Sequence, residues 1–234
     1  MKDIQELKNE KVHDFASLQS VMAILRGEGG CPWDREQTHK SIRGCLIEET
    51  YEVVEAIDTE NPVLLREELG DLLFQAVFHA RIEEEKGSFS IDDVVHDITT
   101  KMIHRHPHVF GTVEAADSEA VLRNWEEIKS EEKQIESVAQ ALRRVPPYLP
   151  ALMRAQKIQG KAQKKLSAGY LTSEEALAAG RAYLDGAASD QDTAEILAET
   201  VFALCAAAEL KGIDLEAALS HRCDAFVENI EKKE

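Results

Sequence analysis

The sequence predicts an all-α protein made of two related helical-bundle halves, completed by association with further copies of the chain. Apolar residues recur at the helical period along most of the 234 residues, and no stretch keeps the strict alternation that marks a half-buried strand. Segments rich in glycine, proline and asparagine separate the periodic stretches, as turns between helices require. The length suffices for one large or two small domains with a real core.

The first predicted helix covers residues 3–26, because the apolar residues between Phe15 and Leu25 follow the helical period. Glycines at 27, 29 and 30 end it, and a loop that contains Trp33 follows. A tryptophan in such a loop either covers the core or stacks on a nucleobase. The sequence leaves both interpretations open.

Two further helices are predicted at residues 41–58 and 62–86, joined by a short turn. Asn61 is suited to the N-cap of the second helix and Pro62 to its first position, and Gly87 follows its end. This helix is apolar nearly all round, which is typical of the centre of a bundle or of an interface between copies. We therefore expect a homodimer or a larger homo-oligomer.

The next helix is predicted to begin after Ser90, in a capping-box-like sequence with Asp93, and to end at Pro107. It carries Lys101 and ends in a cluster of His and Arg at residues 104–108. This cluster can be a solvated helix end whose positive charge complements the helix dipole. It can also be a zinc site, although the spacing is poor. A third interpretation is that, together with Lys101, it holds phosphates.

A helix at 118–133 contains Trp125, which we assign to the core or to a pocket wall. The proline-rich segment 134–150 predicts a linker between a first domain, 1–133, and a second domain, 151–234. Further helices are predicted near residues 149–166, 173–186, 191–211 and 214–232.

The composition limits the class of partner. The chain has 44 acidic against 27 basic side chains, which argues against a general nucleic-acid binder. A nucleotide ligand is compatible with this charge, because a divalent ion reverses the local sign. The four cysteines form no C-x-x-C pair, so we expect reduced thiols and a cytoplasmic protein. No apolar run approaches the roughly 20 residues that span a membrane.

Acidic residues at helical spacing define the candidate site. Glu49 and Glu52 are three residues apart on the first hairpin helix, and Glu68 and Asp71 are three apart on the second. Each pair therefore projects from one helical face, and an antiparallel hairpin brings the two pairs together. Four carboxylates form an all-oxygen site for a hard cation, so we predict Mg²⁺, with Mn²⁺ as the alternative. Gly70 between them indicates a close backbone approach.

The alternative interpretation is a solvated acidic face, which suits most runs of glutamate. It fits Glu55 and Glu60 well, but it fits Asp71 badly because Leu69, Leu72 and Phe74 surround it. Glu48 precedes the first pair and is a candidate for a general base, or for a group that supports the ligands.

The second half of the chain echoes the first. In sequence, residues 193–202 align with residues 65–74, and Lys211-Gly212 aligns with Lys86-Gly87. In this register Glu68 becomes Ile196, while Asp71 becomes Glu199. The two upstream glutamates fall on Ala176 and Ala179, or one residue further on, and such side chains cannot hold a cation. We therefore predict a structural second half without its own site, with chance similarity of apolar helices as the alternative.

These residues together resemble a known family. Glu48-Glu49-x-x-Glu52 followed by Glu68-x-x-Asp71 is similar to the signature of the MazG-type nucleoside triphosphate pyrophosphohydrolases. The resemblance covers nearly the whole chain, since further segments also match the long, two-domain members of the family. These segments are Cys31–His39, Gly70–Phe74, Arg105–Gly111 and Leu149–Gln159.

The resemblance implies helical bundles that associate as dimers or larger assemblies, and Mg²⁺-dependent hydrolysis of NTPs or dNTPs to the monophosphate and pyrophosphate. It implies that Glu49, Glu52, Glu68 and Asp71 are the metal ligands. Contacts to the phosphates and base fall near Lys101, Arg105 and Trp33. Residue 104 is a histidine, whereas an arginine is common at this position in the family. This difference puts the strength of phosphate binding in doubt.

The expected chemistry is in-line attack of water on the α-phosphorus, with Glu48 or Glu49 accepting its proton and Lys101 and Arg105 holding the outer phosphates. Two rivals remain at this stage. One is a pyrophosphatase of narrow specificity, for instance for dUTP. The other is a helical module that binds nucleotide, metal or a protein partner without turnover.

Overall fold

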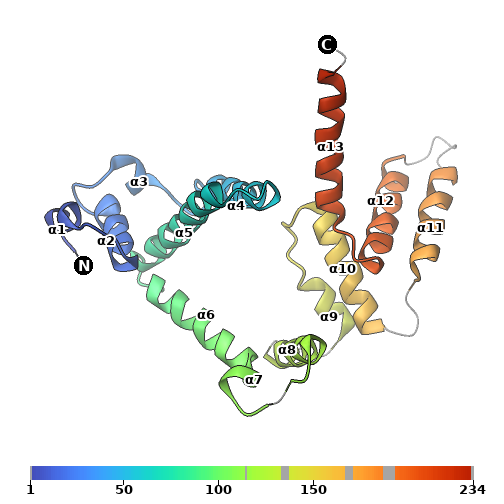
Figure 1. Cartoon of the computed structure of the whole chain (residues 1–234), viewed down its shortest axis with the longest axis horizontal. Coiled ribbons are helices and arrows are strands. Elements are labelled where there is room, and N and C mark those ends of the chain that lie inside the picture. Colours follow the sequence, from blue (N-terminus) through green and yellow to red (C-terminus); the bar gives the residue numbers. More distant parts are fainter. Residues whose placement is uncertain (1, 114, 133–136, 167–170, 187–192, 233–234) are drawn as a thin grey trace. The chain divides into compact units, whose positions relative to one another are not determined.

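The computed structural model describes residues 2–113, 115–132, 137–166, 171–186 and 193–232. Within these ranges the regular elements are α-helices and there is no strand, which confirms the predicted fold class (Figure 1). The chain divides into two compact units, Met1–Trp125 and Glu126–Glu234. The division lies inside helix α8 (Ser118–Glu132), upstream of the predicted linker.

The first unit begins with two helices, α1 (Ile4–Asn9) and α2 (Phe15–Arg26), where the sequence predicted one helix over residues 3–26. That prediction was wrong because Asp14 caps α2. Its side chain accepts a hydrogen bond from the Ser17 backbone at 2.8 Å, and the Ser17 hydroxyl lies within hydrogen-bonding distance of the Asp14 backbone N–H. A local cap of this kind competes with continuation of a helix.

The next elements form the hairpin that carries the candidate site. A short helix, α3 (Pro32–Glu36), lies in the predicted loop, and α4 (Arg43–Asp58) and α5 (Pro62–Glu84) follow. The predicted cap is present, since the Asn61 side chain accepts hydrogen bonds from the backbone of Val63 and Leu64 at 3.2 Å each. The turn between α4 and α5 is short, so the two helices run antiparallel and pack side by side (Figure 1).

The core of the first unit lies where α2, the start of α4 and the later turns of α5 meet. Its buried members are Met22, Ile42, Val77, Phe78 and Ile82. Helices α6 (Ile91–Arg105) and α7 (Pro107–Phe110) follow. Ser90 and Asp93 form the predicted capping box at the start of α6.

The second unit contains α9 (Val138–Arg143), α10 (Ala151–Leu166), α11 (Ser173–Gly186), α12 (Thr193–Leu210) and α13 (Leu215–Glu231). Helix α9 thus occupies part of the segment predicted as a linker. Helix α12 packs against both α10 and α11. A buried cluster of Ala176, Ala206 and Ala207 joins α11 to α12, and Leu177 packs against it.

The segment around Gln156, part of the family-like sequence, has a structural role in the second unit. The buried amide of Gln156 donates to the Ile213 carbonyl at 2.8 Å and accepts from the Leu215 backbone at 3.0 Å. These bonds fasten the turn before α13 to α10. Gly160 lies directly against the Glu209 side chain, so a larger residue there would force Glu209 to move.

Large apolar side chains remain exposed on the helices of the first unit. Ile47, Tyr51 and Val54 follow one stripe of α4, and each is at least 43% exposed. Val94, Val95 and Ile98 on α6 are exposed as well. Of the described helices, none is both long and apolar enough to cross a membrane.

Candidate metal centre

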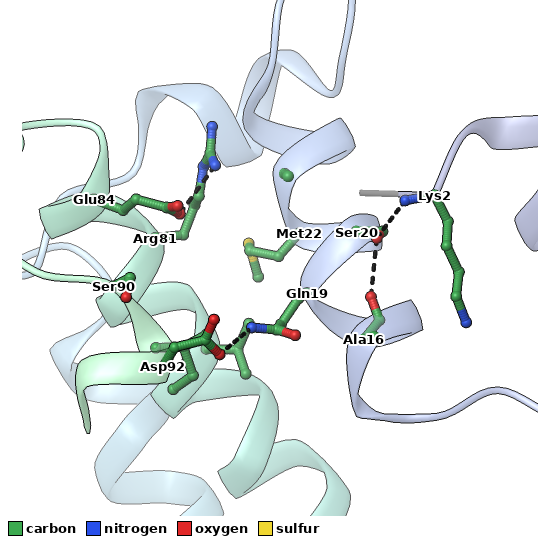
Figure 2. Close-up of a pocket in the computed structure, with 12 residues that line it drawn as sticks. Lys2, Ala16, Gln19, Ser20, Met22, Arg81, Glu84, Ser90 and Asp92 are labelled. Carbon is green, nitrogen blue, oxygen red and sulfur yellow. Dashed lines mark hydrogen bonds and ion pairs between the residues drawn. The ribbon is translucent and has the colours of Figure 1, made fainter. Parts of the chain in front are cut away.

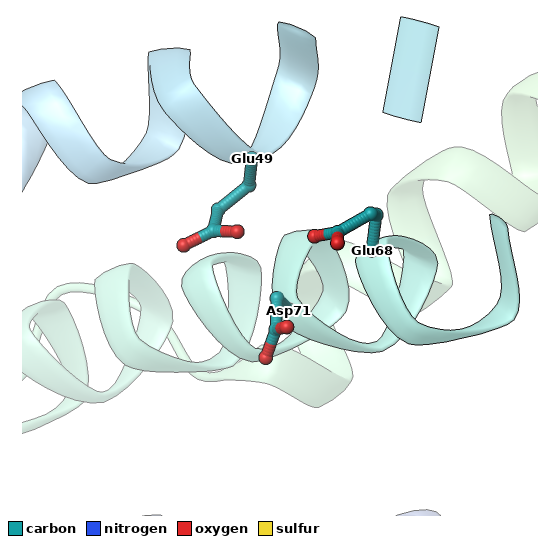
Figure 3. Close-up of side chains that lie close together, drawn as sticks. All are labelled: Glu49, Glu68 and Asp71. Carbon is teal, nitrogen blue, oxygen red and sulfur yellow. The ribbon is translucent and has the colours of Figure 1, made fainter. Parts of the chain in front are cut away.

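The structure brings carboxylates from two helices together. Glu49 on α4 and Glu68 and Asp71 on α5 each offer an oxygen atom, and these atoms all lie within 4.8 Å of one another. Figure 3 shows Glu49 reaching from its helix toward the pair on α5. The spacing of three residues places Glu68 and Asp71 on neighbouring positions of one helical face, as the sequence predicted.

Glu52 lies beside this group. It is close enough to both Glu49 and Glu68 to raise their pKa values. Its position one turn after Glu49 on α4 explains this, because residues three apart on a helix share a face. The four predicted ligands therefore gather in one region of the hairpin.

The electrostatics of this region are those of an unbalanced acidic cluster. Burial raises the pKa of Glu49, and the neighbouring Asp71 charge raises it further. Burial also raises the pKa of Glu68, which is only 9% exposed, and the charge of Glu52 adds to it. Shifts in this direction show that the ionised forms repel one another, so a bound proton or cation stabilises the cluster.

Two features of this region differ from what the sequence suggested. The solvated interpretation was judged to fit Asp71 badly, but Asp71 is exposed, whereas Glu68 is buried. Gly70 was expected to permit a close backbone approach, yet a Cβ atom there would meet no atom of the described chain within 4 Å. The backbone of α5 at Gly70 therefore has open space beside it within the described chain.

The other predicted site residues lie apart from the carboxylates or at the surface. Glu48 is exposed on α4, and Trp33 is 59% exposed. Helix α6 follows the end of α5 that is remote from Glu68, and it carries Lys101 and Arg105 in its later turns. Lys101 is exposed, whereas Arg105 is 8% exposed.

The burial of Arg105 has a clear cause. Its guanidinium lies over the ring of Trp125 at 5.2 Å from the ring centroid. A guanidinium stacked on an aromatic face gains a cation–π attraction. Trp125 is half-buried and so fits the predicted alternatives of core or pocket wall. This stack links α6 to α8 within the first unit.

A histidine network at the other end of the hairpin was not predicted. His39 lies 2.6 Å from Glu83 through Nε2 and 2.7 Å from His79 through Nδ1. The available signal was the spacing of His79 and Glu83, four residues apart on one face of α5. The segment before α4 then had to be folded back onto that face, which sequence spacing does not reveal.

A separate cavity of about 470 Å³ lies between α2, α5 and the start of α6 (Figure 2). Its polar lining is already paired: Gln19 donates to Asp92 at 2.9 Å, and Arg81 and Glu84 lie 3.1 Å apart. The Lys2 backbone donates to the Ser20 hydroxyl at 2.9 Å. The candidate metal ligands do not line this cavity.

An all-α hairpin with converging carboxylates on its two helices defines a class of helical protein suited to a hard divalent cation. The family model of the MazG nucleotide pyrophosphohydrolase domain matches residues 37–110, which include all four carboxylates and the histidine network. A relative of nearly the same extent matches as well. The chain is 38% identical over 227 residues to the nucleoside triphosphate pyrophosphohydrolase/pyrophosphatase MazG of Thermotoga maritima, covering 94% of this chain and 85% of that protein. The chain therefore belongs to the MazG family.

Other relatives match part of the chain. The nucleoside triphosphate pyrophosphohydrolase of Escherichia coli K12 is 50% identical over 143 residues, 61% of this chain and 54% of that protein. The uncharacterized protein YabN of Bacillus subtilis is 49% identical over 158 residues, 67% of this chain and 32% of that protein. The chain thus spans only a part of several relatives.

Proposed function

We propose that this protein hydrolyses nucleoside triphosphates, NTPs or dNTPs, to the monophosphate and pyrophosphate with Mg²⁺, by attack of water on the α-phosphorus. The observation that carries the proposal is the convergence of Glu49, Glu68 and Asp71, with oxygens within 4.8 Å of one another. Membership of the MazG family and the printed names of the Thermotoga and Escherichia relatives support it.

The residues present fit Mg²⁺. Glu49, Glu52, Glu68 and Asp71 would hold it, with Mn²⁺ as a substitute, because hard cations prefer carboxylate oxygens. The raised pKa values of Glu49 and Glu68 show a cluster short of positive charge. When bound, the ion would offset the charge of the phosphates and favour ionisation of the attacking water.

The chain's own groups have separate tasks in this proposal. Glu48 is exposed next to Glu49 on α4, and either carboxylate can accept the proton of the attacking water. Lys101 is exposed and able to hold the outer phosphates. Trp33 offers an exposed ring to a base. Arg105, whose guanidinium lies over the ring of Trp125, is the second candidate for holding the phosphates.

We also propose that a homodimer or larger homo-oligomer is the working form. The exposed apolar stripe on α4 and the apolar residues on α6 support this, because contiguous apolar surface on a helix is usually covered. Gly70 lies on an open side of α5, where a second copy can approach.

The test is release of pyrophosphate from a panel of NTPs and dNTPs with Mg²⁺. We expect Glu68→Ala to lose at least about 100-fold in rate, as removal of a metal-site group does. Glu67→Ala is the matched control, because Glu67 is the exposed neighbour of Glu68 on α5. Equal activity of Glu68→Ala and wild type would exclude the proposed site. The panel also separates broad from dUTP-like specificity, and calorimetric binding without turnover would indicate a non-catalytic module.

A further inference from the structure

Helix α4 is most deeply buried near its two ends. Ile42, the residue before its first turn, is 2% exposed and belongs to the core, and Ala56 near its other end is 1% exposed. Among the described residues of α4 itself, Ala56 is the one that is fully buried. Glu49 lies between these two anchors. The position of its carboxylate therefore depends on how firmly the ends of α4 are fixed to α5.

The acids between the anchors face one another across the hairpin. Oxygen atoms of Glu49, Glu68 and Asp71 all lie within 4.8 Å of one another. Like charges from facing helices are destabilising when no cation lies between them. One end of the hairpin is closed by the short turn at Asn61. The other end has no such covalent restraint, and contacts of the segment before α4 must keep it closed.

His39 makes such a contact. It lies in the segment between α3 and α4, and its Nε2 lies 2.6 Å from an oxygen of Glu83 on α5. Its Nδ1 lies 2.7 Å from Nδ1 of His79, with the two rings only 9° from coplanar. These contacts join residues that are 44 and 40 apart in sequence. They fasten the start of α4 to the later turns of α5.

The network limits where its protons can lie. Glu83 accepts from His39, so Nε2 of His39 carries a hydrogen, and only one hydrogen fits between the two Nδ1 atoms. Burial lowers the pKa of His79, and His39 lowers it further, so the neutral form of His79 is favoured. Protonation of both rings would place like charges in contact.

The surrounding groups keep the acceptor charged. Lys86, then His39 and Ser88, hold the pKa of Glu83 at about 2. From α2, the Arg26 guanidinium donates to the Gln37 carbonyl and pairs with Glu85 at 2.8 Å. On α5, Gln75 presents a buried Oε1, for which the described chain offers no donor.

We propose that His39 is a positioning residue that holds Glu49 beside Glu68 and Asp71 before a cation binds. The contact lies at the opposite end of the hairpin from the turn, so its loss lets α4 swing away under the repulsion of the acids. The proposal rests on the proposed function only in taking Mg²⁺ as the ion of the cluster.

The experiment compares His39→Ala and His39→Gln with wild type. Glutamine can replace the imidazole, since its amide donates to Glu83 and accepts from His79. His221→Ala is the control, because His221 is an exposed histidine of α13. Amide hydrogen exchange at residues 44–50 is measured without metal. Mn²⁺ affinity is measured by electron paramagnetic resonance at about pH 7.5.

We expect His39→Ala to speed exchange in α4 and to weaken Mn²⁺ binding about tenfold, the size typical of groups that orient metal ligands. His39→Gln restores both. Unchanged exchange and affinity in His39→Ala overturns the proposal, and so does a His39→Gln variant that behaves like His39→Ala. If His39→Ala fails to fold, Glu83→Ala decides, because it removes the partner of His39 on α5 and should also speed exchange and weaken binding. If wild type binds no Mn²⁺, the proposed function fails, and amide exchange still decides the role of His39.

Discussion

The hairpins α4–α5 and α11–α12 share one helical framework, and they differ in what lies between their helices. The first has clustered carboxylates there, and the second has buried alanines. Each is followed by a Lys-Gly turn in which the glycine has positive φ, 72° at Gly87 and 66° at Gly212. Each turn leads into a capped helix, at Ser90 and at Asp214. The backbone features that the sequence repeat predicted are therefore present in both halves.

The interiors of the two hairpins differ. Glu49 stands on α4 where the repeat places Ala176 on α11, and Ala176 is fully buried against Ala206 and Ala207. Small side chains let helices approach closely and leave no room for a hydrated ion. The first hairpin instead gathers the carboxylates of Glu49, Glu68 and Asp71 between its helices. The comparison indicates that such a cluster is built at the expense of helix packing.

The largest expected effect is that of a glutamate placed into the alanine cluster. Ala176→Glu would bury a carboxylate without a partner in a tightly packed site, and we expect the second unit to lose about 3 kcal/mol or more of unfolding free energy. Urea denaturation measures this loss. Ala178→Glu, at an exposed position of the same helix, is the control and should change stability little. A stable Ala176→Glu protein would mean that α11 and α12 can separate enough to admit a carboxylate.

Replacing equivalent acids of the two hairpins should affect the rate of pyrophosphate release differently. Asp71→Asn removes a proposed ligand and is expected to lower the rate of pyrophosphate release about 100-fold. Glu199→Gln changes the acid that the repeat places over Asp71, and its rate should stay within about twofold of wild type. Both side chains are exposed, so neither change should alter stability much. Loss of activity in Glu199→Gln would show that the second half also contributes chemistry.

The stabilisation of the fold by Mg²⁺ should depend on pH through this cluster. Glu49 and Glu68 have raised pKa values, so they stabilise the metal-free fold below their ordinary value of 4.5, and this contribution is lost as pH rises through the raised values. We expect Mg²⁺ at ten times its Kd to add about 1.4 kcal/mol near pH 7.5. The gain should shrink near pH 5, where protons compete. Calorimetric melting with Mg²⁺ or chelator measures it, and an equal gain at both pH values would contradict the linkage.

The smallest expected effect concerns glycines in the two hairpins. Gly70→Ala should add up to about 1 kcal/mol, because alanine favours a helix and its Cβ meets no described atom. Gly180→Ala is the counterpart, with its nearest atom, the Ala203 Cβ, at 3.7 Å. Urea denaturation measures the change in stability, and sedimentation velocity measures self-association. If Gly70→Ala weakens self-association instead, a second copy of the chain covers this side of α5.

Local sequence patterns predicted much of the fold. The Asn61 cap and the Ser90 box depend on residues within one turn, so their hydrogen bonds follow from sequence alone. The spacing of Glu68 and Asp71 likewise fixed their common face. The failures came where two local signals compete. The Asp14 cap broke a helix that periodicity alone had extended, because periodicity does not show that a polar residue has become a cap.

The sequence by itself determined the helical class, the antiparallel hairpin and the convergence of carboxylates, since periodicity, caps and short turns act between near neighbours in the chain. Only the tertiary structure decided that Arg105 stacks on Trp125, that Gly70 faces open space, and that His39 reaches Glu83 and His79. Those contacts join residues far apart in sequence, and their formation depends on how whole helices pack.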